Sequence, residues 1–186
     1  AACIKLLYGD AALRGALDKE HFSTLSYEYF AKDITNPWSG LTSYETIQIA
    51  VETAKEFIAG FGRSDTETHN LLICGNTGVG KTFLTNCIAH ELINAGHGIV
   101  YLSANELLKV LEDYKFRRND TDDFETVYER YTSVYECDLL IIDDLGTELT
   151  NKATITELFE LLNKRQLQHR STIISTNLSM QHIKET

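Results

Sequence analysis

The strongest constraint on the fold of this chain is a short apolar segment that leads directly into a glycine-rich loop and then into a helical pattern. Residues 71–74 (Leu-Leu-Ile-Cys) form a continuous apolar run of strand length, and the loop of residues 75–82 follows at once. From Lys81 to Ala95 apolar side chains recur at helical spacing, and Gly96 is a typical helix stop. A strand, a tight loop and a helix in this order predict an α/β domain.

The loop fits the pattern G-x-x-x-x-G-K-[ST] of a phosphate-binding P-loop. Its glycines let backbone N–H groups wrap phosphate oxygens at the start of a helix, where the helix dipole favours anions. Lys81 is expected to reach the β- and γ-phosphates, and the Thr82 hydroxyl is expected to bind Mg²⁺. ATP and Mg²⁺ are therefore the predicted cofactors. The residues predicted to bind them are Gly75, Asn76, Thr77, Gly78, Val79, Gly80, Lys81 and Thr82.

Three further apolar strands alternate with helical patterns along the chain. The strands are residues 99–102, 139–142 and 172–175, and the helices lie at 104–115, near 124–134 and near 155–162. Unbroken apolar strands that alternate with helices predict a mostly parallel sheet covered on both faces, which is a three-layer α/β P-loop NTPase. The carboxyl ends of all strands then meet at one edge of the sheet, where ligands bind.

The chain divides into an expected N-terminal helical and linker segment, residues 1–41, and a P-loop ATPase core, residues 42–186. Thr42 and Glu45 have the spacing of a capping box, and the helix that they begin ends at Gly60 and Gly62. In the N-terminal segment, leucines indicate one or two short helices: Leu6, Leu7, Leu13 and Leu17. Four aromatic residues either flank the base of a nucleotide or seal the edge of the core, and sealing is the commoner role. They are Phe22, Tyr27, Tyr29 and Phe30.

Two acidic residues, Asp143 and Asp144, close the strand at 139–142. Two acids after a strand usually cap a helix in solvent, but a P-loop upstream makes Asp143 a candidate to hold Mg²⁺ directly or through water. Asp144 is then the candidate to orient or deprotonate the attacking water, and Glu148 is a weaker one. Many P-loop ATPases have Glu at this position. Because Asp is one methylene shorter, we expect slow or partner-dependent hydrolysis.

Ser175, Thr176 and Asn177 follow the last strand. A polar side chain at the end of a strand beside the P-loop strand can hydrogen-bond the γ-phosphate or the attacking water. The alternative is that Asn177 caps the segment that follows.

A short basic cluster interrupts an otherwise acidic chain: Lys115, Phe116, Arg117 and Arg118. It is either part of a contact with single-stranded DNA, where cations track phosphates and rings stack on bases, or a solvated helix end. The balance of 17 Lys and Arg against 27 Asp and Glu gives a formal charge of −10, which argues against a broad surface for duplex DNA.

No apolar run approaches the roughly 20 residues that a membrane span needs. The four cysteines, Cys3, Cys74, Cys87 and Cys137, show no C-x-x-C pair. We therefore expect buried thiols, no zinc site, no membrane contact and a cytoplasmic location.

Three motifs together resemble a known family: G-N-T-G-V-G-K-T, L-L-I-I-D-D-L-G-T-E-L and T-I-I-S-T-N-L-S. They are similar to the AAA+ ATPases of the DnaC/DnaI group of bacterial helicase loaders and to their relative IstB, an ATPase that assists transposases. The resemblance runs from about Phe22 to the end of the chain. It implies an AAA+ core with Asp143 at the magnesium site, Asp144 in the catalytic acidic position and Asn177 as the first sensor. Lys81, Asp144 and Asn177 are thus the expected catalytic residues.

The resemblance also implies partners. Such loaders bind the replicative DNA helicase and place it on single-stranded DNA, and we further expect nucleotide-dependent self-association. AAA+ proteins take an arginine finger from a neighbouring subunit, but beyond Asn177 this chain has Lys184 and no arginine. We therefore expect the ATPase core of a longer protein, which binds ATP and hydrolyses it weakly because such a finger is worth ~10³–10⁵ in rate.

The prediction is thus an AAA+ ATPase that loads the replicative helicase during DNA replication. Two alternatives remain open at this point: a transposase helper of the IstB kind and a nucleotide-dependent interaction module with little hydrolysis. A metabolic P-loop kinase fits the acidic motif and the sensor less well.

Overall fold

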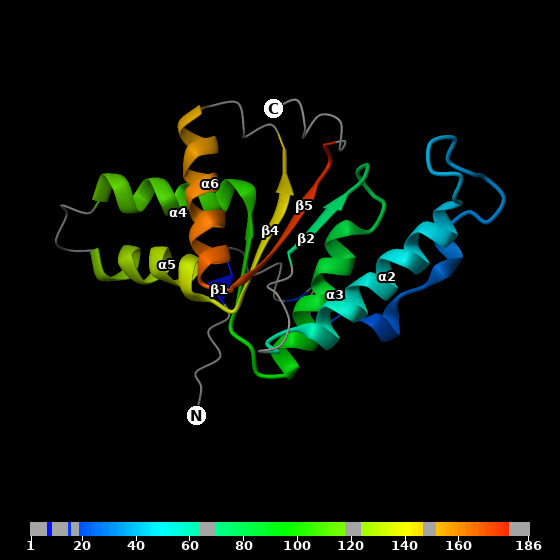
Figure 1. Ribbon diagram of the computed structural model, residues 1–186, viewed down its shortest axis with the longest axis horizontal. Coiled ribbons are helices and arrows are strands. Elements are labelled where there is room, and N and C mark those ends of the chain that lie inside the picture. The colour runs from blue at the N-terminus through cyan, green and yellow to red at the C-terminus, as the bar shows by residue number, and fades with distance from the viewer. Residues whose placement is uncertain are drawn as a thin grey trace.

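The computed structural model describes residues 7–8, 15, 19–63, 70–117, 124–146 and 152–178, with the backbone alone at 7–8, 117 and 152–154. The strands in these residues run parallel in one sheet, in the order β1-β3-β4-β5-β2 (Figure 1). The strands are β1 (Leu7–Tyr8), β2 (Leu71–Cys74), β3 (Ile99–Ser103), β4 (Leu139–Leu145) and β5 (Ser171–Thr176). The four strands predicted from apolar runs are therefore confirmed. The P-loop strand β2 lies at one edge of the sheet and pairs with β5.

Helices cover both faces of this sheet (Figure 1). Helices α2 (Ser43–Gly60) and α3 (Lys81–Asn94) lie on one face, and α4 (Ala104–Arg117), α5 (Phe124–Glu136) and α6 (Lys152–Leu167) lie on the other.

Successive side chains of a strand point to opposite faces. Tyr101 and Ile141 accordingly pack in the core beneath α2 and α3, while Val100 and Leu140 pack beneath α4 to α6. Burial on both faces explains why the strands are apolar without alternation, and the predicted three-layer α/β architecture is confirmed. Within the described part of the chain, no helix combines the length and apolar character needed to cross a membrane.

The start of α2 follows its local sequence signal. Thr42 Oγ1 accepts a hydrogen bond of 3.1 Å from Glu45 N, and Glu45 Oε2 accepts one of 2.8 Å from Thr42 N. These reciprocal bonds satisfy backbone donors that have no partner within the helix. The helix ends at Gly60, as predicted, and Gly62 turns the chain with φ of 71°.

The N-terminal segment differs from its prediction. Leu7, where the leucine spacing indicates helix, belongs to β1, which pairs with the outer edge of β3. An edge strand offers unpaired backbone groups, and pairing with them outweighs the helical spacing. Leu6, Leu13 and Leu17 lie outside the described residues. Two short 3₁₀ turns, Phe22–Thr24 and Tyr27–Tyr29, lead toward α2.

One buried guanidinium joins three elements at the amino end of the sheet. Arg165 on α6 is 0% exposed. Its donors bond the carbonyl oxygens of Val134 and Ser171, at 2.8 and 2.6 Å, and the hydroxyl of Thr172, at 3.0 Å. Burial lowers the pKa of Arg165 from its ordinary value. The side chain therefore stabilises the end of α5 against α6 and the start of β5.

The cysteines of the described residues are free thiols. Cys87 on α3 is fully buried, as predicted, whereas Cys74 at the end of β2 is only half-buried. Burial, with a smaller effect of the Glu20 and Glu91 charges, raises the pKa of Cys87 to about 12. Because the thiolate is the reactive form, Cys87 serves as packing.

Candidate functional site

The glycine loop closes on the start of α3 at the carboxyl edge of the sheet. Gly75 N donates to the carbonyl of Thr176 on β5 at 3.2 Å, which fixes the loop's first residue. A Cβ atom at Gly75 would lie 3.0 Å from Val79 Cγ2, so a larger residue there would have to displace the Val79 side chain. Gly80 is the N-cap of α3 with φ of 94°, a left-handed conformation. The loop thus leads into a helix N-terminus whose free N–H groups favour an anion.

The ammonium group of Lys81 is buried at the centre of the site. Lys81 is 9% exposed, and its Nζ donates to Gly75 O at 2.8 Å, to Asn76 O at 3.0 Å and to Asn177 Oδ1 at 2.6 Å. An ammonium has three donors, and these contacts use all of them. Lys81 therefore connects the two ends of its own loop to the residue that follows β5.

The carboxylate of Asp143 lies among three hydroxyl groups. Its Oδ2 accepts bonds from Thr82 Oγ1 at 3.0 Å and from the Tyr101 hydroxyl at 3.2 Å, and its Oδ1 accepts one from Ser175 Oγ. The structure thus brings Thr82 and Asp143 together, as expected for two magnesium ligands. The sequence predicts a polar contact for the segment of Ser175 but not a bond from Ser175 to Asp143, and it gives no signal for Tyr101, because a tyrosine within an apolar strand is not diagnostic of a contact.

The Tyr101 hydroxyl donates to Asp143 from the protein interior. Burial, and next the charge of Asp143, raises the pKa of Tyr101 far above its ordinary value. The hydroxyl also lies 2.7 Å from Thr85 Oγ1 on α3.

An irregularity in β4 allows both acidic residues to face the same side. Ile142 pairs with Ile174 and Leu145 with Thr176, so β4 contains one more residue than β5 between these pairs. The backbone of Asp144 accommodates this irregularity by adopting a left-handed conformation, with φ of 58°. Adjacent residues of a regular strand would point to opposite faces, and a bulge redirects them. Asp144 N donates to Ser175 Oγ at 2.9 Å, and Asn177 Nδ2 donates to Asp144 Oδ1.

These residues surround a cavity of about 400 Å³. Its lining residues are Thr77, Gly78, Gly80, Lys81, Thr82, Phe83, Asp143, Asp144, Ser175 and Asn177. The sites predicted from three separate strand ends therefore come together in one place, because parallel strands share one carboxyl edge. Gly75 and Asn76 contribute carbonyl groups to Lys81, and Glu148 lies outside the described residues.

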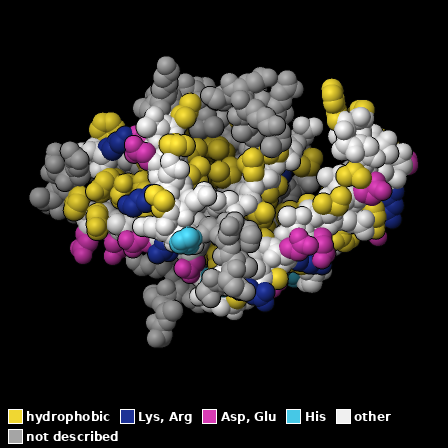
Figure 2. All heavy atoms as spheres, viewed as in Figure 1, with side chains coloured by type: hydrophobic (Ala, Val, Ile, Leu, Met, Phe, Trp, Pro, Cys, Tyr) yellow, Lys and Arg dark blue, Asp and Glu magenta, His cyan; other side chains and the backbone are white. Residues whose placement is uncertain are grey.

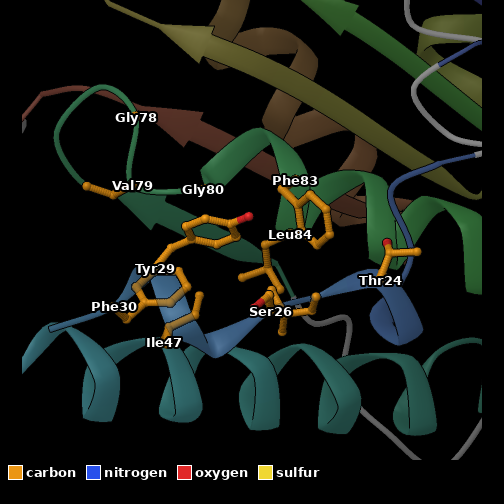
Figure 3. Close-up of a pocket in the computed structure, with 11 residues that line it drawn as sticks. Thr24, Ser26, Tyr29, Phe30, Ile47, Gly78, Val79, Gly80, Phe83 and Leu84 are labelled. Atoms are coloured by element: carbon orange, nitrogen blue, oxygen red, sulfur yellow. The ribbon is translucent and has the colours of Figure 1, made fainter. Parts of the chain in front are cut away.

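A second, apolar cavity of about 290 Å³ adjoins the first and shares Gly78, Gly80 and Phe83 with it. Figure 3 shows its side chains gathered from the N-terminal segment, α2, the glycine loop and α3. The lining residues are Thr24, Leu25, Ser26, Tyr29, Phe30, Ile47, Gly78, Val79, Gly80, Phe83 and Leu84. Phe22 and Tyr27 pack against the core, as the commoner reading of the aromatics predicted. Tyr29 is 88% exposed and lines the cavity instead.

Oxygen donors of the first cavity fit a hard divalent cation. Asp143 supplies a carboxylate and Thr82 a hydroxyl, and Mg²⁺ characteristically takes one or two such protein ligands and completes its shell with water and phosphate. In the described ranges, no group of three or more His, Cys, Asp or Glu side chains is arranged to hold a metal.

The structure describes only part of the basic cluster at the end of α4. Lys115 Nζ forms an ion pair with Glu157 of α6, so this residue has a structural role that the sequence did not predict. Phe116 is 82% exposed. The Arg117 side chain and Arg118 lie outside the described residues. On the face in Figure 2, Lys and Arg side chains are interspersed with Asp and Glu.

The sequence model of the IstB-like ATP binding protein family matches residues 58–186. The chain is 21% identical to the replicative helicase loader DnaC of Escherichia coli (strain K12) over 175 residues, which cover 90% of this chain and 68% of DnaC. It is 30% identical to the ATP-binding protein of insertion sequence IS1162 from Pseudomonas fluorescens over 112 residues, which cover 60% of this chain and 45% of that protein.

The fold has solved counterparts. The crystal structure of DnaI matches with a TM-score of 0.63 at 21% identity, over 92% of this chain and 79% of the DnaI chain. At this identity the likeness concerns the fold alone, and the fold is that of an AAA+ P-loop domain.

Proposed function

The chain belongs to the IstB-like ATP binding protein family, and on that premise we propose that it is an AAA+ ATPase that loads the replicative helicase during DNA replication. The observation that carries this proposal is the convergence of Lys81, Asp143 and Asn177 on one cavity beside the glycine loop. The similarity to DnaC, which extends over 90% of this chain, supports the choice of partner.

The two adjoining cavities, one polar and one apolar, support one orientation for ATP. The triphosphate lies against the N-terminus of α3, where Lys81 exchanges a loop carbonyl for a phosphate oxygen. The base enters the apolar cavity, where Tyr29 supplies an exposed ring on which it can stack. Asp143 and Thr82 hold Mg²⁺, which when bound neutralises charge on the phosphates.

We assign hydrolysis to Asp144 and Asn177, which both line the first cavity. The Asp144 carboxylate orients a water molecule and accepts its proton as the water attacks the γ-phosphorus in line, while the bond to the bridging oxygen breaks and ADP leaves with inorganic phosphate as the other product. Asn177 bonds both Lys81 and Asp144, which supports the proposal that its amide senses the γ-phosphate.

The partners are the host's replicative helicase and single-stranded DNA, and ATP binding promotes self-association of the loader. A cytoplasmic location follows from this role. The contribution of Lys115 to DNA binding is small in this proposal because Glu157 neutralises its charge. Arg117 and Arg118 remain the proposed DNA contacts.

The proposal is tested by passing the complete protein and the host's replicative helicase through a sizing column, with and without ATP. An ATP-sensitive complex is the expected result. Lys81→Ala should abolish both ATP binding and the ATP effect, while Lys109→Ala, an exposed lysine of α4, should change neither. Normal ATP affinity in Lys81→Ala would refute the site assignment.

A transposase helper is the second candidate, and the 30% identity to the IS1162 protein favours it. It shares the ATP site and differs in its partner. Absence of a helicase complex under both conditions, together with duplex-DNA binding and stimulation of a transposase, would select this function. If the complete protein binds ATP but hydrolyses none with DNA and partner present, the nucleotide-dependent interaction module is correct instead.

A further inference from the structure

Two buried hydroxyl groups lie directly behind the Asp143 carboxylate. Tyr101 on β3 and Thr85 on α3 are both 0% exposed, and their oxygens are 2.7 Å apart. Tyr101 donates to Asp143 Oδ2, and Thr85 Oγ1 lies within hydrogen-bond distance of both the Tyr101 hydroxyl and the backbone carbonyl of Thr82, the latter at 2.9 Å. The pair therefore touches both proposed ligands of Mg²⁺ from the protein interior, although neither residue lines the cavity.

Burial of the Tyr101 hydroxyl requires an explanation. The Tyr101 ring belongs to the core beneath α2 and α3, where phenylalanine would supply the same apolar ring. A buried hydroxyl is unfavourable unless its hydrogen bonds compensate for lost hydration. Its bonds here are to Asp143 and Thr85, so the hydroxyl is explained by the site and not by the core.

The number of hydrogens sets the direction of these bonds. Each hydroxyl has one hydrogen, and an ionised carboxylate can only accept. Because bonds to a charged acceptor are the stronger ones, the Tyr101 hydrogen belongs to Asp143. Thr85 then donates either to the Tyr101 oxygen or to the Thr82 carbonyl, and Tyr101 keeps its bond to Asp143 in both cases.

The Asp143 carboxylate thus accepts hydrogen bonds from three elements: from Thr82 of α3, Tyr101 of β3 and Ser175 of β5. Thr82 and Ser175 line the cavity, where ligand oxygens compete for their hydroxyls. Tyr101 does not line the cavity, so ligand oxygens do not compete for its hydroxyl. Outer partners of this kind fix the orientation of metal ligands.

We infer that Tyr101, supported by Thr85, is a positioning residue that fixes the orientation of the Asp143 carboxylate toward the Mg²⁺ of the bound nucleotide. This inference rests on the proposed function, because it requires that Asp143 binds Mg²⁺.

The test is a titration of a fluorescent ATP analogue on the complete protein, in EDTA and over a range of Mg²⁺ concentrations. Tyr101→Phe removes one oxygen atom and retains the ring. The Mg²⁺ concentration that gives half of the Mg²⁺-dependent gain in affinity should rise about tenfold, the low end of what loss of an outer partner costs. Affinity in EDTA should be unchanged. Thr85→Val should give a smaller rise, and Thr85→Ser, which keeps the hydroxyl, should match the wild type.

Tyr135→Phe is the matched control, because Tyr135 is also buried but packs on the opposite face, beneath α4 to α6. Its Mg²⁺ curve should coincide with that of the wild type. Thermal unfolding of each variant reports whether it folds. If Tyr101→Phe does not fold, Thr85→Val decides: a raised Mg²⁺ requirement supports the inference, and an unchanged one overturns it.

An unchanged Mg²⁺ curve in a folded Tyr101→Phe, or an equal loss of affinity with and without Mg²⁺, would remove this inference and leave the proposed function intact. Wild-type protein that binds no ATP analogue under either condition would remove both, so the two failures are distinguishable.

Discussion

The Lys81 ammonium lies 2.6 Å from Asn177 Oδ1, although 96 positions separate the two residues in the sequence. The amide nitrogen of the same Asn177 donates to Asp144, so one side chain bridges the glycine loop and the acidic end of β4. This bridge exists because β5 lies between β2 and β4 in the sheet. A change at Asn177 should therefore affect events that need the loop and Asp144 together.

Asn177→Ala should slow single-turnover ATP hydrolysis by the complete protein by about 10²–10³-fold, the cost of removing one polar group aimed at a transition state. Nucleotide affinity should fall much less, because Lys81 keeps its phosphate contacts. Asn177→Asp keeps an oxygen for Lys81 but places a second carboxylate beside Asp144, so its hydrolysis should be lost as well. Asn105→Ala, an exposed site on α4, is the control. Hydrolysis at the wild-type rate in Asn177→Ala would contradict the bridge's role.

Substitutions of the adjacent residues Asp143 and Asp144 should have different effects. Asp143→Asn should weaken Mg²⁺ binding by at least the ~10–100-fold that loss of an outer partner costs, because a ligand itself is altered. Asp144→Asn should leave Mg²⁺-dependent ATP affinity intact and lower hydrolysis by about 10²–10⁴-fold, as expected for loss of a general base. Measuring affinity and hydrolysis in both variants distinguishes the roles. The same pattern in both variants would show that the bulge at Asp144 has no functional consequence.

Tyr29→Ala should weaken ATP binding by about 1–3 kcal/mol, the usual contribution of a ring that stacks on a base. Tyr29→Phe should restore the affinity. Inorganic triphosphate, which has no base, should bind Tyr29→Ala and the wild type equally in a competition assay. Trp38→Ala is the matched control, since Trp38 is an exposed aromatic of the same segment at 96% exposure and does not line the cavity. Loss of triphosphate binding in Tyr29→Ala would point to a disturbed loop instead.

Arg165→Met should destabilise the fold by about 3–5 kcal/mol, because the buried carbonyls of Val134 and Ser171 would lose their donors. Arg165→Lys should also destabilise it, since a lysine cannot reproduce the planar fork of donors. Urea unfolding provides the measurement. Arg130→Ala, an exposed arginine of α5, should stay within about 0.5 kcal/mol of the wild type. A wild-type midpoint for Arg165→Met would show that water satisfies these carbonyls.

Local features of the chain could be predicted from its sequence because their causes lie within a few residues. The bonds between Thr42 and Glu45 need only one helical turn, and Gly80 is required by the φ of the position that it occupies. Strands that are apolar without alternation imply a sheet buried on both faces. From that inference alone, Thr82 and Asp143 could be expected at one edge, and they are hydrogen-bonded there.

Register and burial were decided by the tertiary structure. One extra residue in β4 directs Asp144 toward Asn177, and the pairing of β3 with β4 brings Tyr101 within reach of Asp143. Contacts between distant segments also decide that Tyr29 is exposed, that Arg165 is buried and that Leu7 pairs with β3. The sequence by itself determined which residues could perform this chemistry, because residue type and local spacing carry that information. Only the tertiary structure decided which of them meet, because contacts between distant segments depend on how the whole sheet is aligned and covered.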